Sequence, residues 1–143
     1  MKRVALLLLF AAACKTVAVG TSRTGADDAR SAVERFLAAA RAQDLQALSV
    51  VWGNEKGAQR DQLARSELEQ REVIMIRLLR HDQSRISEPQ RAPNGRVALT
   101  VDLKQGALTA SPVFTAVRAK SGRWYVENLD LTMLQNKGFG GKS

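Results

Sequence analysis

Cysteine, histidine and aromatic residues are scarce in this sequence of 143 residues. It contains one cysteine and one histidine, and 5% of its residues are aromatic. One cysteine and one histidine cannot supply the ligands of a zinc site, and a lone cysteine leaves no framework of internal disulfides. We therefore expect a protein without a bound metal and without a cofactor.

Motifs for phosphate binding and for nucleophilic catalysis are also missing. The glycine-rich stretch GFGGKS, residues 138–143, follows no β-α unit and lacks the spacing of a P-loop. No serine lies in the nucleophile elbow that places a catalytic serine in hydrolases. The sequence therefore offers no motif of a nucleotide-binding protein or of a serine hydrolase.

Long hydrophobic runs are missing as well. Residues 4–13 form an apolar run of ten residues without a charge, whereas a transmembrane helix needs about 20. The run follows Lys2 and Arg3 and ends in three alanines. This order of basic, apolar and small residues is typical of a secretory signal peptide, which we predict over residues 1–13.

Cys14 directly follows these small residues, and small residues that end in cysteine resemble the lipobox of bacterial lipoproteins, although Ala11 stands where leucine is commonest. In that family the cysteine receives a diacylglyceryl group and becomes the mature N-terminus, so the resemblance implies lipidation at Cys14. Two or three acyl chains hold a protein firmly on a membrane, whereas one holds it only marginally. The alternative is an ordinary signal peptide cleaved near Ala13, with Cys14 incidental.

Lys15, the residue after Cys14, bears on where in the cell the protein is located. Lys15 stands where the inner-membrane retention signal of enteric bacteria has aspartate. The resemblance therefore implies a protein of the bacterial cell envelope that is anchored in a membrane through Cys14. It favours the outer membrane, facing the periplasm, over the inner membrane.

Positive charge predominates, since 22 lysines and arginines stand against 14 aspartates and glutamates, and the formal net charge is +8. The basic residues are scattered, and an envelope location also argues against DNA or RNA, so we expect no nucleic-acid partner. Asp61 precedes Arg65 by four residues, and Glu67 precedes Arg71 by four, a spacing that pairs charges on a helix surface. The alternative is that these cations attract anionic lipid headgroups beneath the anchor.

The chain after the signal peptide is long enough for one domain. Residues 14–25 are small, polar and aperiodic, and they predict a flexible tether between lipid and domain. We place the domain at residues 26–134. Residues 135–143 are rich in glycine, and we expect them to be disordered.

Three helices are predicted in the first half of the domain. Residues 27–42 carry apolar side chains at helical spacing. Residues 44–52 predict a short second helix with Asp44 as its N-cap. Residues 58–80 predict a long third helix, although their β-branched side chains would also suit a strand. The apolar stripe of the first helix comprises Ala29, Val33, Phe36, Leu37 and Ala40.

From residue 83 onwards the apolar residues change from a helical period to a period of two, which is typical of strands. A weak strand around Ile86 is followed by Asn94-Gly95, a strong signal of a hairpin. Residues 97–104 alternate strictly between apolar and other side chains. Two further strands, over 111–119 and 124–131, flank a second turn. In the first of these two we expect one face to carry Val113, Thr115 and Val117.

Two segments resemble the nuclear transport factor 2-like superfamily, which includes the SnoaL-like proteins. AVERFLAAARAQDLQAL, residues 32–48, is similar to its opening helix, aspartate and second helix, and FTAVRAKSGRWYVENLDL, residues 114–131, is similar to its closing hairpin. Helices followed by a meander of strands also predict an α+β protein. The resemblance implies three N-terminal helices packed on a curved, mostly antiparallel sheet of four or more strands, which together form a cone with a pocket at its wide end.

Because that superfamily contains enzymes and non-enzymes alike, the fold does not decide the function. Asp102 is the best candidate for a catalytic base if its side of the strand lines the cone; otherwise it faces solvent. His81 comes at the end of the third predicted helix, where the helix dipole favours it in a capping role, and catalysis is the alternative. Trp52 and Trp124 could line a ligand pocket or belong to the core.

We expect a non-enzymatic lipoprotein whose domain binds a small apolar ligand or a protein of the envelope. Neither Asp102 nor His81 has a partner, evident in the sequence, that would orient it or shift its pKa. One alternative is a cone-type isomerase or cyclase that uses Asp102 or His81. The other is a structural module that forms a homodimer through its sheet.

Overall fold

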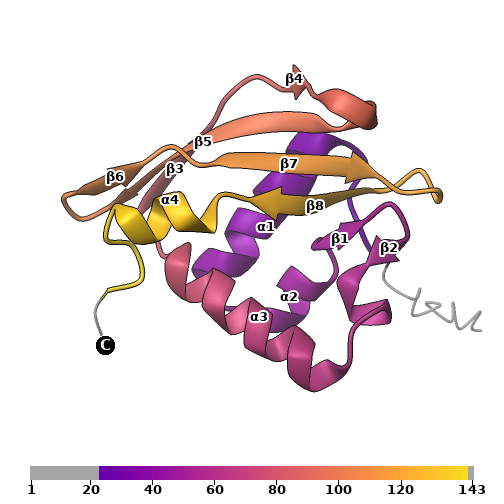
Figure 1. Ribbon diagram of the computed structural model, residues 1–143, viewed down its shortest axis with the longest axis horizontal. Coiled ribbons are helices and arrows are strands. Elements are labelled where there is room, and N and C mark those ends of the chain that lie inside the picture. Colours follow the sequence, from indigo (N-terminus) through magenta and orange to yellow (C-terminus); the bar gives the residue numbers. More distant parts are fainter. Residues whose placement is uncertain (1–22, 142–143) are drawn as a thin grey trace, which may run out of the picture.

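The computed structural model describes residues 23–141, in which helices pack against one face of an antiparallel sheet (Figure 1). The chain is therefore an α+β protein, as predicted. The predicted signal peptide and Cys14 lie outside the described residues, as does the tether up to residue 22. Among the helices of residues 23–141, none combines the length and the apolar composition that crossing a bilayer requires.

Helix α1 (Ala29–Ala42) forms where it is predicted. Asp28 caps its start, because one carboxylate oxygen accepts a hydrogen bond from the Ser31 backbone N–H at 2.7 Å. This bond holds the pKa of Asp28 below its usual value. Gln43, with a left-handed φ of 55°, ends the helix. The buried stripe contains all five predicted residues and comprises Ala29, Ala32, Val33, Phe36, Leu37, Ala39 and Ala40.

Helix α2 (Leu45–Ser49) begins after the predicted cap, since Asp44 Oδ1 accepts a hydrogen bond from the Ala47 backbone N–H at 3.0 Å. The helix ends earlier than predicted because the following residues join the sheet side of the molecule. There the Val126 backbone N–H donates to the carbonyl of Val51 at 2.9 Å. Residues 50–52 are thereby fixed beside the last strand.

Helix α3 (Arg65–Leu78) starts later than the predicted residue 58. The preceding residues form a small hairpin of β1 (Gly53–Asn54) and β2 (Gly57–Ala58), and a 3-10 turn, η1 (Gln59–Asp61), follows. Gly53 allows the close packing of this hairpin, because a Cβ at that position would lie 2.4 Å from the carbonyl oxygen of Gly57.

Six strands form the main sheet in the order β3-β5-β7-β8, with β4 and β6 also paired to β5, and these pairings are antiparallel. The predicted hairpin at Asn94-Gly95 joins β4 to β5, and Asn94 adopts a left-handed φ of 59° there. The bounds are β3 (Gln83–Ile86), β4 (Gln90–Arg91), β5 (Val97–Gln105), β6 (Leu108–Ala110), β7 (Val113–Arg118) and β8 (Trp124–Leu129).

Val113, Thr115 and Val117 do not share one face of β7 as predicted. Val113 is 42% exposed, whereas Phe114 and Ala116 are fully buried. Phe114 packs edge-to-face on Phe36 of α1, with ring centroids 5.9 Å apart. A bulge between Thr115 and Ala116 then shifts the register, so that Val117 is buried as well, in a separate small cluster with Tyr125, Ala58 and Ala119.

Residues 23–141 contain four α-helices, not three, because α4 (Leu131–Asn136) follows the last strand. Asp130 follows β8 and caps α4, since its Oδ1 accepts a hydrogen bond from the Met133 backbone N–H at 2.9 Å. The expectation of disorder from residue 135 is also corrected for residues 135–141. Phe139 is 3% exposed in the main core, and Arg77 of α3 donates to the carbonyl of Gly140 at 2.9 Å.

Candidate functional site

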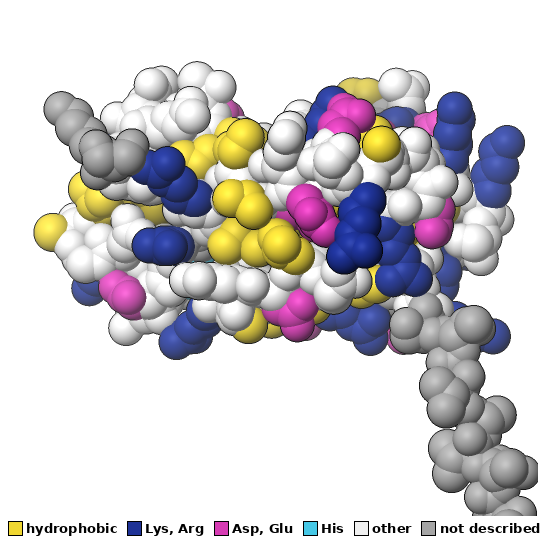
Figure 2. Space-filling model, turned by 90° about the horizontal axis from the view of Figure 1, so that it is seen from below, with side chains coloured by type: hydrophobic (Ala, Val, Ile, Leu, Met, Phe, Trp, Pro, Cys, Tyr) yellow, Lys and Arg dark blue, Asp and Glu magenta, His cyan; other side chains and the backbone are white. Residues whose placement is uncertain are grey.

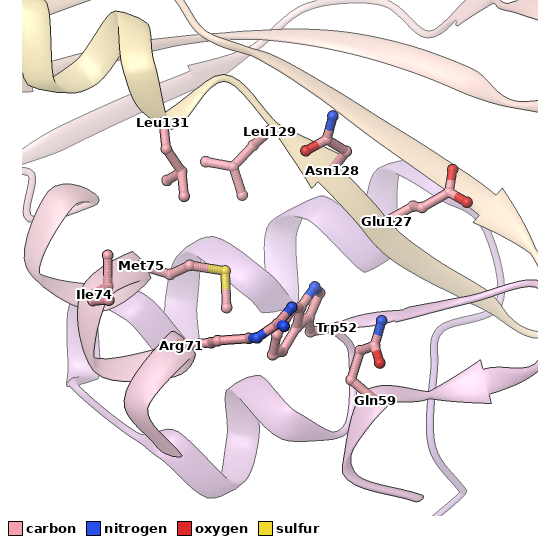
Figure 3. Close-up of a pocket in the computed structure, with 9 residues that line it drawn as sticks. All are labelled: Trp52, Gln59, Arg71, Ile74, Met75, Glu127, Asn128, Leu129 and Leu131. Atoms are coloured by element: carbon pink, nitrogen blue, oxygen red, sulfur yellow. The ribbon is translucent and has the colours of Figure 1, made fainter. Parts of the chain in front are cut away.

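A cavity of about 460 Å³ lies between α3, the end of β8 and the start of α4. Small-molecule sites commonly measure roughly 300–1,000 Å³. We call this space the α3–β8 cavity (Figure 3). Its lining residues are Trp52, Gln59, Arg71, Ile74, Met75, Glu127, Asn128, Leu129 and Leu131.

Backbone contacts hold Trp52 at the side of the cavity. Residue 52 bridges to Val126 of β8, and its carbonyl accepts a hydrogen bond from the Gln59 backbone N–H at 2.9 Å. Trp52 is 8% exposed. Figure 3 shows Arg71 and Met75 extending from α3 toward Trp52. The indole, the thioether and the leucines of the lining therefore give the cavity an apolar part, beside the polar side chains of Gln59, Arg71, Glu127 and Asn128.

The charged groups of the lining are already engaged. Both oxygens of Glu127 accept hydrogen bonds from Arg96, at 2.8 and 2.9 Å. Arg96 also donates to Glu55, and these carboxylates raise the pKa of the Arg96 guanidinium further above its ordinary value. Arg71 pairs with Glu67 through one nitrogen, at 2.5 Å. The arrangement suits an apolar molecule that meets polar groups at one edge, and it presents no free carboxylate as a base.

Only one of the two tryptophans predicted for a pocket lines the α3–β8 cavity. Trp124 stands at the start of β8, where its backbone exchanges hydrogen bonds of 2.8 and 2.9 Å with Ala26. Its side chain is half-buried and packs against the main core. Trp52 therefore remains the pocket candidate, and Trp124 has a structural position.

Asp102 and His81 lie outside the α3–β8 cavity. Asp102 is exposed on β5, and one of its oxygens accepts a hydrogen bond from Ser111 Oγ at 2.7 Å. His81 is 9% exposed, and its Nδ1 lies 2.6 Å from the carbonyl oxygen of Leu79, the C-cap residue of α3. Because a carbonyl can only accept, Nδ1 donates in this bond, which satisfies an otherwise free carbonyl at the helix end.

The sheet face that Asp102 shares is polar. Thr100, Asp102 and Lys104 of β5 are all exposed, and helices α1, α2 and α3 lie on the other side of the sheet (Figure 1). In residues 23–141 no group of three or more histidine, cysteine, aspartate or glutamate side chains is placed to hold a metal ion.

Glu72 is a notable residue of α3 that was not predicted from the sequence. It is 1% exposed, and its Oε1 has no hydrogen-bond partner among the described residues. Burial, with a smaller contribution from Glu69, raises the pKa of Glu72 to about 7. The sequence does indicate that Glu72 faces inward, because Glu72 lies four residues after Leu68 and three before Met75, on the buried stripe of α3.

Comparisons of the sequence with protein-family models and with curated proteins found no match. The resemblance to bacterial lipoproteins rests on residues 11–14, and the resemblance to the nuclear transport factor 2-like superfamily rests on residues 32–48 and 114–131.

Proposed function

We propose that this protein is a lipid-anchored binding protein of the bacterial envelope, whose domain holds a small, mainly apolar ligand in the α3–β8 cavity. The anchor is the lipid on Cys14, and the outer membrane facing the periplasm is the favoured location. The fold is the nuclear transport factor 2-like cone. The order of helices before an antiparallel sheet, with the helices on one sheet face, supports this fold.

The α3–β8 cavity is the observation that carries the binding function. Its volume suits a small molecule, and its wall combines Trp52, Met75 and Leu129 with polar groups at the edge. The two candidate catalytic groups support the enzyme alternative poorly. Asp102 is exposed and bonded to Ser111, and His81 is bonded to the end of α3. A cone-type isomerase or cyclase would need one of them beside its substrate.

A dye-binding experiment with two matched variants tests the binding function. Ile74 and Val73 are neighbours on α3, and each is 53% exposed. Figure 2 shows hydrophobic side chains gathered on one face of the molecule. Ile74 lines the α3–β8 cavity and Val73 does not. Ile74→Trp should therefore fill the cavity mouth, and Val73→Trp should leave it open.

We expect the wild-type protein to enhance the fluorescence of 1-anilinonaphthalene-8-sulfonate. Ile74→Trp should weaken dye binding about tenfold or more, which corresponds to about 1.4 kcal/mol. Val73→Trp, Asp102→Asn and His81→Gln should bind the dye like the wild type. If Ile74→Trp binds normally, or if both tryptophan variants lose binding equally, the α3–β8 cavity is not the site.

A further inference from the structure

A second cavity, of about 530 Å³, lies on the other side of α3, where α3 meets α2 and η1. We call it the α2–α3 cavity. Its inner part is formed by Glu72, Ser49 and Leu68, which are 1%, 3% and 7% exposed. The other lining residues are Gln46, Arg60, Asp61, Leu63, Arg65 and Glu69. None of these residues lines the α3–β8 cavity.

The inner part of this cavity contains a carboxyl group that is not satisfied by the protein. Glu72 Oε1 is buried and lacks a hydrogen-bond partner among the described residues. An unpartnered buried acceptor is costly, and a buried carboxylate needs a donor or a positive charge. The neighbouring hydroxyl does not supply one, because Ser49 Oγ donates to the carbonyl of Gln46 at 2.7 Å.

The two arginines of the cavity do not supply a positive charge to Glu72 either. Arg65 donates to Glu69 at 2.8 Å, and its side chain is 85% exposed. Arg60 lies 3.8 Å from Asp61. Each arginine thus lies beside a carboxylate at the rim of the cavity, Arg60 beside Asp61 and Arg65 beside Glu69. Glu72 is the carboxyl group of the lining that has no positively charged partner among the described residues. A positively charged donor that entered the cavity would be attracted to Glu72.

The groups around Glu72 favour an ammonium group over a metal ion. In residues 23–141 no group of three or more histidine, cysteine, aspartate or glutamate side chains is placed to hold a metal ion, and a hard cation such as Ca²⁺ takes six or more oxygen ligands. A primary ammonium group needs fewer partners, because it is compact and carries three donors. Leu63 and Leu68 of the lining offer apolar surface to an attached alkyl chain.

We propose that the α2–α3 cavity binds a small primary ammonium compound, whose head group donates to Glu72 and whose alkyl part contacts Leu63 and Leu68. This site is separate from the α3–β8 cavity, and it does not depend on the lipid anchor. An anionic ligand would share Arg60 and Arg65 with Asp61 and Glu69, and it would be repelled by the ionised Glu72.

The proposal predicts a direction of pH dependence. The ammonium head binds the ionised carboxylate. Because the pKa of Glu72 is about 7, roughly a tenth of the groups are ionised at pH 6 and roughly nine-tenths at pH 8. An alkylammonium group, like that of lysine, stays protonated over this range. Its apparent affinity should therefore rise about tenfold from pH 6 to pH 8.

The test is an NMR titration of the protein with n-butylammonium chloride, which follows the backbone amides and the side-chain carboxyl carbon of Glu72. We expect shifts at the residues of the α2–α3 cavity, a dissociation constant about tenfold lower at pH 8 than at pH 6, and a lower pKa of Glu72 when the cavity is occupied. Butanol, the neutral control, and butyrate, the anionic control, should bind at least tenfold more weakly.

Two matched variants complete the test. Glu72→Gln removes the charge while keeping the shape, and it should abolish binding of n-butylammonium. Glu69→Gln removes a carboxylate at the rim of the same cavity and should retain binding. The proposal is overturned if butyrate binds more tightly than n-butylammonium, if Glu72→Gln binds like the wild type, or if n-butylammonium leaves the titration of the Glu72 carboxyl unchanged.

Discussion

Replacing Phe36 by alanine should lower the free energy of unfolding by about 3–5 kcal/mol. Phe36 is fully buried on the inner face of α1. Its ring packs on Phe114 of β7, with centroids 5.9 Å apart and planes at 80°. The change removes both the buried area and the aromatic contact that joins the helical layer to the sheet, and it leaves a cavity. Urea denaturation followed by circular dichroism measures the loss.

Val113→Ala is the matched control for Phe36→Ala. Val113 is next to Phe114 on β7 but is 42% exposed. Its truncation should change the free energy of unfolding by less than about 0.5 kcal/mol. A loss below about 1 kcal/mol for Phe36→Ala would show that Phe36 is not part of the core.

The stability of the protein should fall as the pH rises from 5 to 8, and Glu72 should account for the fall. The pKa of Glu72 is about 7 in the folded protein, compared with an ordinary value of 4.5. Because the folded state holds this proton more tightly, its stabilising contribution is fully present below pH 4.5 and is lost as the pH rises through 7. Glu72→Gln, which cannot ionise, should lack this dependence.

Between pH 5 and pH 8, the wild-type protein should lose about 2–3 kcal/mol relative to Glu72→Gln. Urea denaturation of both proteins at the two pH values measures the difference. Glu69→Gln, which changes a rim residue of the same cavity, should keep most of the wild-type pH dependence. Equal pH dependence in the wild type and in Glu72→Gln would mean that Glu72 does not carry a raised pKa.

The sequence predicts the elements that depend on residues close together in the chain. The α1 stripe and the cap residue Asp44 are visible in the sequence, because each depends on residues within its own helix. The hairpin at Asn94-Gly95 is visible for the same reason, since few residues other than asparagine and glycine adopt a left-handed φ at low cost.

The sequence did not predict the features that depend on contacts between residues far apart in the chain. Phe139 stands alone in a glycine-rich segment and shows no period, but it is buried in the main core. The inner face of β7 depends on the contact of Phe114 with Phe36, which is far away in the chain. The spacing of Glu72 from Leu68 and Met75 places it on the inner stripe of α3, but the absence of a hydrogen-bond partner for its Oε1 depends on the packing of α2 and α3.

In the candidate site, too, some residues can be predicted from the sequence and others depend on distant contacts. Trp52 could be named from the sequence as a pocket residue, since aromatic side chains commonly line such sites. Arg71, Ile74 and Met75 could not be named, because their place in the α3–β8 cavity depends on where the end of β8 lies relative to α3. Asp102 alternates with buried residues of β5, but the sequence alone does not say which face lines a cavity.

Membrane partition of the Cys14→Ser protein is the most direct test of the proposed lipid anchor. Cys14 is the only cysteine of the chain and follows a signal-like run. The wild-type protein, produced in a bacterial host, should fractionate with membranes. The Cys14→Ser protein with its signal peptide removed should be soluble, because no acyl chain can be attached. If that Cys14→Ser protein still partitions with membranes like the wild type, Cys14 is not the anchor.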